Sequence, residues 1–332
     1  MLSAVIESTA IDLMLPATPM TTNIVNLDDL AQAARTFAAD AKASSTRRAY
    51  TKDWKLFSSW CRSMGLPELP AAPEAVASYI TAMATQGRKP ATIQRALVSI
   101  SQAHKMAGNE SPTSSAVVRE TLKGIRRSLG VAQDQKAAAL PENIKAMLGA
   151  SSEDILGTRD RALLLLGFAG GFRRSELVAL DVSDCEFTGD GVVVTLRRSK
   201  CDQEGEGRRI GIPFGSSPEA CPVRCLRRWL EAAGIGHGPI FRRVGRWGHV
   251  GDQRLDGRAV AVVVQKYAKL IGMDPKKFGG HSLRAGLCTS AARAGKTERS
   301  IMNQTGHRSV TMVRKYIRDG SLFIENAASG LL

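Results

Sequence analysis

The stretch Gly306-His307-Arg308-Ser309-Val310-Thr311-Met312-Val313-Arg314-Lys315-Tyr316-Ile317 places a histidine and a tyrosine nine residues apart near the end of the chain. Two further clusters stand upstream of it, His281-Ser282-Leu283-Arg284 and, earlier, Arg173-Arg174-Ser175-Glu176. Tyrosine can form a covalent bond to a phosphate, and arginine and histidine are the side chains that a phosphodiester needs around it. The three clusters together predict an enzyme that breaks DNA through a phosphotyrosine, without a metal or a nucleotide cofactor.

The three clusters supply candidates for the positive charge, the nucleophile and its proton acceptor that this chemistry needs. Cleavage of a phosphodiester without a metal needs positive charge on the non-bridging oxygens, a nucleophile, and a proton for the leaving oxygen. Arg173 and Arg284 are candidates for the charge, because a guanidinium is always ionised and can hold two oxygens at once. Tyr316, with an ordinary phenol pKa of about 10, needs a proton acceptor, for which His281 is the candidate. His307 is expected to donate a hydrogen bond to the phosphate.

Each cluster also has a purely structural interpretation. An Arg-x-x-Glu pair one helical turn apart is usually a surface ion pair that contributes ~0.3–0.5 kcal/mol. A tyrosine at helical spacing from Met312 is commonly a core aromatic residue. The joint order and spacing of the clusters, rather than any one of them, favours catalysis.

Composition and charge favour a folded protein with a polyanionic partner. The 332 residues can form two domains, and a hydrophobic content of 43% is sufficient for buried cores. The formal charge of +15 favours nucleic acid as the partner. A basic surface that merely keeps the protein in solution is the alternative.

Cysteine usage and hydropathy argue against metal, membrane and secretory functions. Six cysteines are scattered through a chain without a signal peptide, which favours reduced thiols and a cytoplasmic, nucleoid-associated protein. Cys221 and Cys225 stand four residues apart, but no second pair completes a zinc set, so no metal is expected. No apolar run approaches the ~20 residues of a membrane span, so no membrane partner is expected.

The chain divides by pattern into a tail, a helical domain, a linker and a mixed domain. Residues 1–25 are small, polar and punctuated by proline, which predicts a flexible tail. Residues 26–129 show only helical periodicity. Helices are predicted from Asn26, from Ser45, and over Pro73–Met83, Pro90–Met106 and Ser114–Ser128. Residues 130–140 lack periodicity and are the predicted linker.

Residues 141–332 show a mixed pattern. Gly191–Arg198 is rich in β-branched residues and predicts a strand, with Arg208–Pro213 as its antiparallel partner. Helices are predicted over Pro141–Gly149, Thr158–Ala169, Ser175–Leu180, Pro222–Ala233, Arg258–Ile271, Leu283–Ala294, Thr297–Thr305 and Val310–Ile317. The predicted fold class is mainly α with a small antiparallel β-sheet, in a helical domain followed by an α+β domain.

In their order and spacing these clusters resemble the tyrosine site-specific recombinases of the phage integrase family. The resemblance covers the chain from about residue 30 to its end and includes all the catalytic positions of the family. It implies a helical core-binding domain of the SAM-like kind and a catalytic domain that close as a clamp around double-stranded DNA. It also implies a homotetramer on DNA that acts at a specific recombination site without a cofactor.

The resemblance assigns roles to individual residues. Arg173 matches the first family arginine, and Glu176 matches an acidic position that supports the site without reacting. His281 and Arg284 match the second histidine–arginine pair. His307 matches a position filled by histidine or tryptophan, and Tyr316 matches the nucleophile that forms a 3′-phosphotyrosyl bond.

Lys200 matches the lysine of a β-hairpin that gives a proton to the leaving 5′-oxygen. The alternative for Lys200 is a solvated hairpin lysine, because Arg197 and Arg198 crowd the same turn. The reaction implied is strand cleavage and rejoining through a Holliday junction, for integration, excision or resolution. A type IB topoisomerase with the same chemistry, and a DNA-binding protein of the same fold without catalysis, remain alternatives.

DNA contacts outside the catalytic site are expected in the first domain. Basic side chains there are expected to hold phosphates, and a helix in the major groove is expected to read bases. The Pro90–Met106 helix is the candidate reader. The candidate contact residues are Arg47, Lys89, Gln94, Arg95, Arg126 and Arg127. A solvated basic face is the alternative for each of them.

Overall fold

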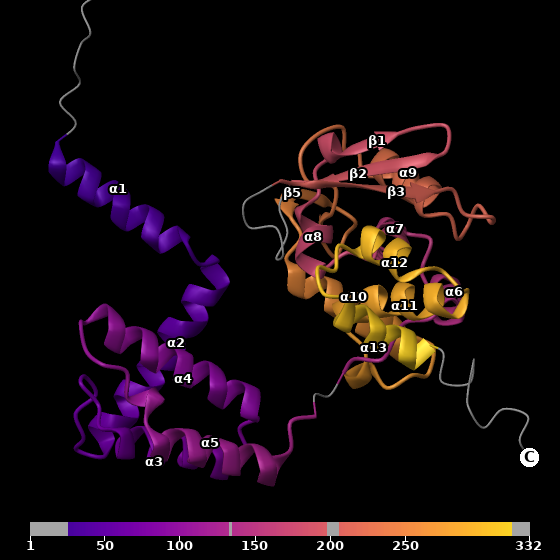
Figure 1. Cartoon of the computed structure of the whole chain (residues 1–332). Coiled ribbons are helices and arrows are strands. Elements are labelled where there is room, and N and C mark those ends of the chain that lie inside the picture. Colours follow the sequence, from indigo (N-terminus) through magenta and orange to yellow (C-terminus); the bar gives the residue numbers. More distant parts are fainter. Residues whose placement is uncertain (1–25, 133–134, 198–205, 321–332) are drawn as a thin grey trace, which may run out of the picture. The chain divides into compact units, whose positions relative to one another are not determined.

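The computed structural model describes residues 26–132, 135–197 and 206–320 (Figure 1). Its internal contacts separate into two compact units, the first ending at Ala132 and the second beginning at Gln133. Helices dominate both units, and the strands form two small antiparallel sheets. The predicted fold class is therefore confirmed.

The first unit is helical throughout its described residues. Its helices are α1 Leu27–Asp40, α2 Ser44–Ser63, α3 Pro73–Thr85, α4 Pro90–Met106 and α5 Ala116–Leu129, with a short 3₁₀ turn at Pro112–Ser114. The Asn26 side chain accepts a hydrogen bond from the backbone N–H of Asp28 at 3.1 Å, so the predicted cap of α1 is present. Proline opens α3 and α4, where its missing N–H costs nothing.

A compact core joins α2, α3, α4 and α5. Phe57, Tyr79 and Ile93 are among its buried residues. His104 is fully buried on the inner face of α4. Its Nδ1 lies 2.8 Å from the carbonyl oxygen of Ile100, and its Nε2 accepts from the backbone N–H of Ala71 at 2.9 Å. Because a carbonyl oxygen can only accept, His104 carries its proton on Nδ1.

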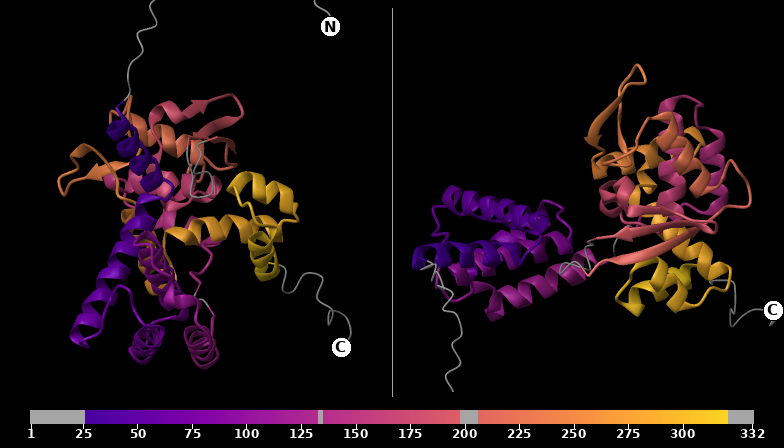
Figure 2. Two further views of the ribbon diagram at one scale, coloured as in Figure 1. Left: turned by 60° about the vertical axis from the view of Figure 1, so that its left-hand side comes forward. Right: turned by 90° about the horizontal axis from the view of Figure 1, so that it is seen from above.

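The second unit contains both sheets. Its helices are α6 Pro141–Gly149, α7 Ile155–Ala169, α8 Arg174–Ala179, α9 Pro222–Ala232, α10 Gly257–Leu270, α11 Gly280–Arg293, α12 Glu298–Thr305 and α13 Val310–Gly320. Its strands are β1 Cys185–Phe187, β2 Gly191–Leu196, β3 Arg208–Pro213, β4 Arg242–Val244 and β5 Val250–Arg254. In both Figures 1 and 2 the helices α11 to α13, drawn in orange-yellow and yellow, stay together.

The predicted hairpin of β2 and β3 is present, and β1 extends it on the other side of β2. Strands β1, β4 and β5 were not predicted. β1 and β4 each have three residues, which is too short for a period-two pattern to show. β5 reads Val-Gly-Asp-Gln-Arg, which has little strand propensity.

The core of the second unit surrounds α7, whose leucines 163, 164 and 166 are fully buried. The end of the predicted linker belongs to this unit, because the backbone N–H of Ala139 donates to the carbonyl of Ser282 at 2.9 Å. A side chain at Gly286 would place a Cβ 1.9 Å from the Ala139 carbonyl oxygen, so only glycine allows this close approach. None of the helices in the described ranges is long and apolar enough to cross a membrane.

Candidate active site

Five of the six predicted catalytic residues meet in the second unit. Arg173 directly precedes α8, His281 and Arg284 lie in the first turns of α11, His307 follows α12, and Tyr316 lies on α13. The sixth, Lys200, lies outside the described residues, in the connection between β2 and β3. Residues far apart in the sequence are thus brought together because α11, α12 and α13 pack on one another.

Arg173 and Glu176 hold each other at the start of α8. The Glu176 carboxylate accepts from the backbone N–H of Arg173 at 2.9 Å and from its Nη1 at 2.5 Å. Glu176 is buried, whereas the Arg173 side chain is 18% exposed. The surface ion pair considered from the sequence is therefore a largely buried pair that orients the Arg173 guanidinium.

Arg284 is buried on α11, with 1% of its surface exposed. Its Nη1 donates to the carbonyl oxygens of Gly171 at 2.7 Å and Thr305 at 2.6 Å. Its Nη2 is also buried but finds no hydrogen-bond partner within the described part of the chain. A buried guanidinium with an unused N–H is costly in isolation and provides a donor for an anion.

Tyr316 and His281 are in direct contact. The Tyr316 hydroxyl lies 2.6 Å from Nε2 of His281, and only 6% of the tyrosine is exposed. Tyr316 packs on Ala285 and Cys288 of α11, which fixes the ring beside that helix. Tyr316 is therefore a core aromatic residue, as one interpretation of the sequence expected, and its hydroxyl also meets a proton acceptor.

His307 follows the left-handed turn at Gly306, where φ is +67°. Its ring lies beside that of Tyr316, with 5.9 Å between the ring centres. Its Nδ1 lies 2.7 Å from the hydroxyl of Thr305. The turn thus brings the imidazole of His307 back against Thr305, the last residue of α12.

Arg208 was not predicted as a site residue. It opens β3, and its guanidinium donates to the carbonyls of Asn303, Gln304 and Thr305 at 3.2, 3.0 and 3.1 Å. These are carbonyls at the end of α12, which have no partner within the helix and favour a cation. The sequence could have indicated its inward position, because side chains alternate along a strand and Arg208 therefore lies on the same face as the buried Ile210 and Ile212.

Positive charge dominates the site and shifts its titrating groups. Partial burial and the charges of Arg284 and Arg173 lower the pKa of His281. Burial, followed by the same two arginines, lowers the pKa of His307 to about 3. Burial and Arg173 lower the pKa of Arg284 to about 10, although Glu176 opposes the shift. An anion bound among these groups would counteract the part of each shift that comes from the arginine charges.

A groove of about 640 Å³ runs beside His281 and Tyr316. Its lining includes the basic side chains of Lys136, Arg293 and Lys315. The groove beside Tyr316 therefore has a surface that favours a negatively charged ligand.

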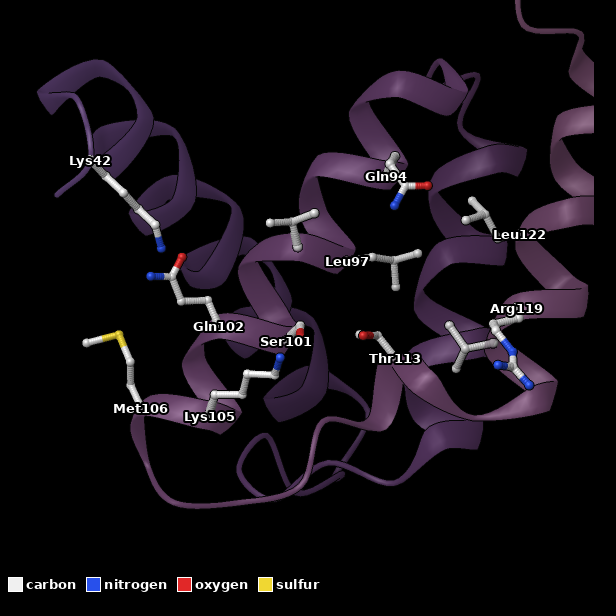
Figure 3. A pocket seen from close by; sticks show the side chains of 12 residues that line it. Lys42, Gln94, Leu97, Ser101, Gln102, Lys105, Met106, Thr113, Arg119 and Leu122 are labelled. Carbon is white, nitrogen blue, oxygen red and sulfur yellow. The ribbon is translucent and has the colours of Figure 1, made fainter. Parts of the chain in front are cut away.

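The predicted DNA-contact residues lie in the first unit, and all are exposed. Arg95 also pairs with buried Asp53 of α2 at 2.6 and 3.0 Å, so two of its nitrogens are used inside the unit. A groove of about 620 Å³ lies along α4, and the side chains of Lys42, Gln94, Lys105 and Arg119 line it (Figure 3). The remaining contact candidates are Arg47 on α2, Lys89 before α4, and Arg126 and Arg127 at the end of α5.

Comparison with known proteins relates this site to one family. The model described as the phage integrase family matches residues 139–321. An integrase/recombinase XerD homolog of Selenomonas ruminantium is 41% identical over 92% of this chain and 90% of its own length. The recombinase Cre of Escherichia phage P1 is 24% identical over 82% of this chain and 86% of its own length.

The fold is also similar to that of a solved recombinase. A lambda integrase dimer bound to a COC′ core site gives a TM-score of 0.59 at 18% identity, over 87% of this chain and 94% of that one. The family model covers the residues that build the site, from α8 to α13. The chain belongs to the phage integrase family, whose tyrosine recombinases cleave and rejoin DNA by transesterification.

Proposed function

We propose that this protein is a site-specific DNA recombinase in which Tyr316 attacks the scissile phosphate. One observation carries the proposal: the Tyr316 hydroxyl contacts His281 at 2.6 Å, close to a buried arginine whose Nη2 has no partner in the described structure. A nucleophile, a proton acceptor and an unused positive donor are three of the groups that phosphoryl transfer without a metal requires.

The proposed reaction exchanges one phosphodiester for another. The Tyr316 hydroxyl gives its proton to His281 as its oxygen bonds to phosphorus, and the bond from phosphorus to the 5′-oxygen breaks. Lys200 gives a proton to that leaving oxygen. Arg173, Arg284 and His307 hold the non-bridging oxygens as charge develops on them. Attack by a 5′-hydroxyl reverses these steps and releases Tyr316, so no external energy source is needed.

The first unit is proposed to supply the remaining DNA contacts as a core-binding domain, with the second unit as the catalytic domain. Its candidate contact residues are basic or polar and exposed, which suits contacts to phosphates and base edges. We further propose that four copies act on two duplexes through a Holliday junction, as the family resemblance implies. The comparisons give no support to the topoisomerase alternative.

The test begins with selection, from random duplexes, of DNA that the full chain binds. Substrates with a nick beside the scissile position are then made from the selected sequences, so that the released strand end is lost and covalent complexes accumulate. The wild-type protein is expected to form a protein–DNA adduct that survives denaturation. Tyr316→Phe is expected to bind the same DNA and form none.

The control variant is Tyr267→Phe, which removes a buried tyrosine hydroxyl on α10 that contacts Asp160 rather than the site. It should still form the adduct. An adduct that persists in Tyr316→Phe would remove Tyr316 from the nucleophilic role. Binding without any adduct in the wild-type protein would favour the non-catalytic alternative.

A further inference from the structure

Thr305 has two short contacts through one hydroxyl oxygen. This residue ends α12 and is fully buried. Its Oγ1 lies 2.6 Å from the carbonyl oxygen of Ile301, one turn earlier, and 2.7 Å from Nδ1 of His307. The hydroxyl carries a single proton, so it can donate to only one of these two neighbours.

The two contacts together decide where the protons lie. A carbonyl oxygen has no proton, so its 2.6 Å contact with the Thr305 hydroxyl is favourable only if the hydroxyl donates to it. The oxygen of the hydroxyl is then an acceptor toward His307. Its 2.7 Å neighbour Nδ1 must therefore carry a proton of its own. His104 follows the same logic in the first unit, where the Ile100 carbonyl requires a proton on Nδ1.

The surroundings hold Thr305 in this position. Its carbonyl oxygen accepts from Arg284 at 2.6 Å and from Arg208 at 3.1 Å, so the backbone is fixed from two directions. Gly306 makes the left-handed turn that brings His307 back to the hydroxyl. A Cβ at Gly306 would lie 2.7 Å from Nε of Arg208, so the position of Arg208 leaves no room for a side chain at this turn.

We propose that Thr305 is a positioning residue that holds neutral His307 with its proton on Nδ1, so that Nε2 can donate to a phosphate only after gaining a proton. The tautomer itself is independent of the proposed function. Its consequence for cleavage rests on that function.

The charges around His307 make the proton uptake depend on the substrate. The positive groups whose charges act on the ring are Arg284, Arg173 and Arg208, with His281 as a further titrating neighbour. The Tyr316 ring, which belongs to α13, also lies beside the His307 ring. Without an anion, burial of the imidazole and then these charges keep His307 neutral. A phosphate among them favours the imidazolium, so DNA and a proton are expected to bind together.

The direct test is nitrogen NMR of the full chain labelled with ¹⁵N-histidine, near neutral pH and without DNA. The signals of His307 are identified by their loss in His307→Gln. The wild-type protein should show a protonated Nδ1 and an unprotonated Nε2. Thr305→Ser keeps the hydroxyl and should give the same pattern, whereas Thr305→Val should shift the proton toward Nε2.

A wild-type spectrum with the proton on Nε2 would overturn the proposal without any variant, so the test does not depend on how Thr305→Val folds. An unchanged pattern in a folded Thr305→Val protein would overturn it as well. Thermal unfolding of the two Thr305 variants establishes that they are folded under the conditions of the spectra.

The consequence for cleavage is tested by the pH dependence of adduct formation on the selected DNA. The wild-type and Thr305→Ser proteins should lose activity as pH rises and the DNA-bound imidazolium loses its proton. Thr305→Val should lose this high-pH limb, because its neutral His307 can donate from Nε2. A purely structural role would lower the rate equally at every pH. Absence of any adduct would refute the proposed function and leave the NMR result standing.

Discussion

His281 and Tyr316 are 35 positions apart in the sequence, yet Nε2 of the histidine lies 2.6 Å from the hydroxyl of the tyrosine. This contact requires α11 and α13 to pack side by side, which they do around Ala285 and Cys288. A neutral imidazole can accept the tyrosine proton and an imidazolium cannot. In the proposed reaction, the protonation state of His281 therefore controls whether the contact is productive.

The first prediction concerns the acidic limb of the pH profile. The pKa of His281 lies below its ordinary value of about 6.5, so the neutral form persists into mildly acidic solution. Adduct formation should fall only when the pH drops below this lowered pKa. His281→Gln should slow cleavage by about 10²–10⁴-fold, the usual contribution of a general base. Single-turnover rates of adduct formation across the acidic range check both expectations. If the rate of His281→Gln still falls at the same acidic pH, the titration belongs to another group.

The second prediction concerns Lys200, which lies outside the described residues. Lys200→Ala should strongly slow cleavage of DNA with an ordinary 5′-oxygen, because that leaving group needs a proton. It should have much less effect on DNA with a bridging 5′-sulfur, since a thiolate leaves without one. Cleavage rates on the two substrates provide the comparison, and equal losses on both would exclude Lys200 as the general acid.

The third prediction separates two adjacent arginines of β3. Arg208 donates to three carbonyls at the end of α12, whereas Arg209 pairs with Glu186 on the surface, with 66% of its side chain exposed. Arg208→Ala should lower the free energy of unfolding by about 2 kcal/mol, since hydrogen bonds from charged groups contribute ~1.5–3 kcal/mol. Arg209→Ala should change it by less than about 0.5 kcal/mol. Urea unfolding of both variants tests this, and equal effects would contradict the inward role of Arg208.

The fourth prediction concerns the pair that joins α2 to α4. Arg95→Ala leaves the carboxylate of Asp53 unpaired with only 5% of its side chain exposed. The expected loss of unfolding free energy is about 2 kcal/mol, below the ~3–5 kcal/mol of a fully buried pair, because Arg95 itself is half exposed. Gln94→Ala, on the exposed side of the same helix, is the matched control. Chemical denaturation measures both, and a loss no larger than that of the control would show that the pair contributes little.

The fifth prediction concerns stability in acid. The pKa of His307 is about 3 in the folded protein, whereas an unfolded histidine has a pKa of about 6.5. Between these values the unfolded chain binds more protons, so folding weakens as pH falls below about 6.5. His307→Asn cannot titrate and should lose less stability than the wild-type protein between about pH 7 and pH 5. Urea unfolding at both pH values gives the comparison, and identical losses would contradict the shift.

The local elements were largely predictable because their signals are local. The helix over Pro90–Met106 begins and ends as predicted, since a proline opens it and apolar residues recur along one face. The hairpin strands were predicted from β-branched residues, and β3 has the predicted bounds. The short strands β1 and β4 were not predictable, because three residues are too few to define a period.

The sequence by itself determined which groups are candidates for the proposed reaction: one tyrosine, two histidines, two arginines and one lysine in a fixed order. Most of them lie on elements whose caps and periodicity are encoded within a few residues. Only the tertiary structure decided how these groups act on one another. The buried end of α12 joins Thr305 to His307, Arg284 and Arg208, and none of these contacts follows from spacing along the chain. The physical reason is that proton positions and pKa values depend on burial and on charges from distant segments, which meet only when the chain folds.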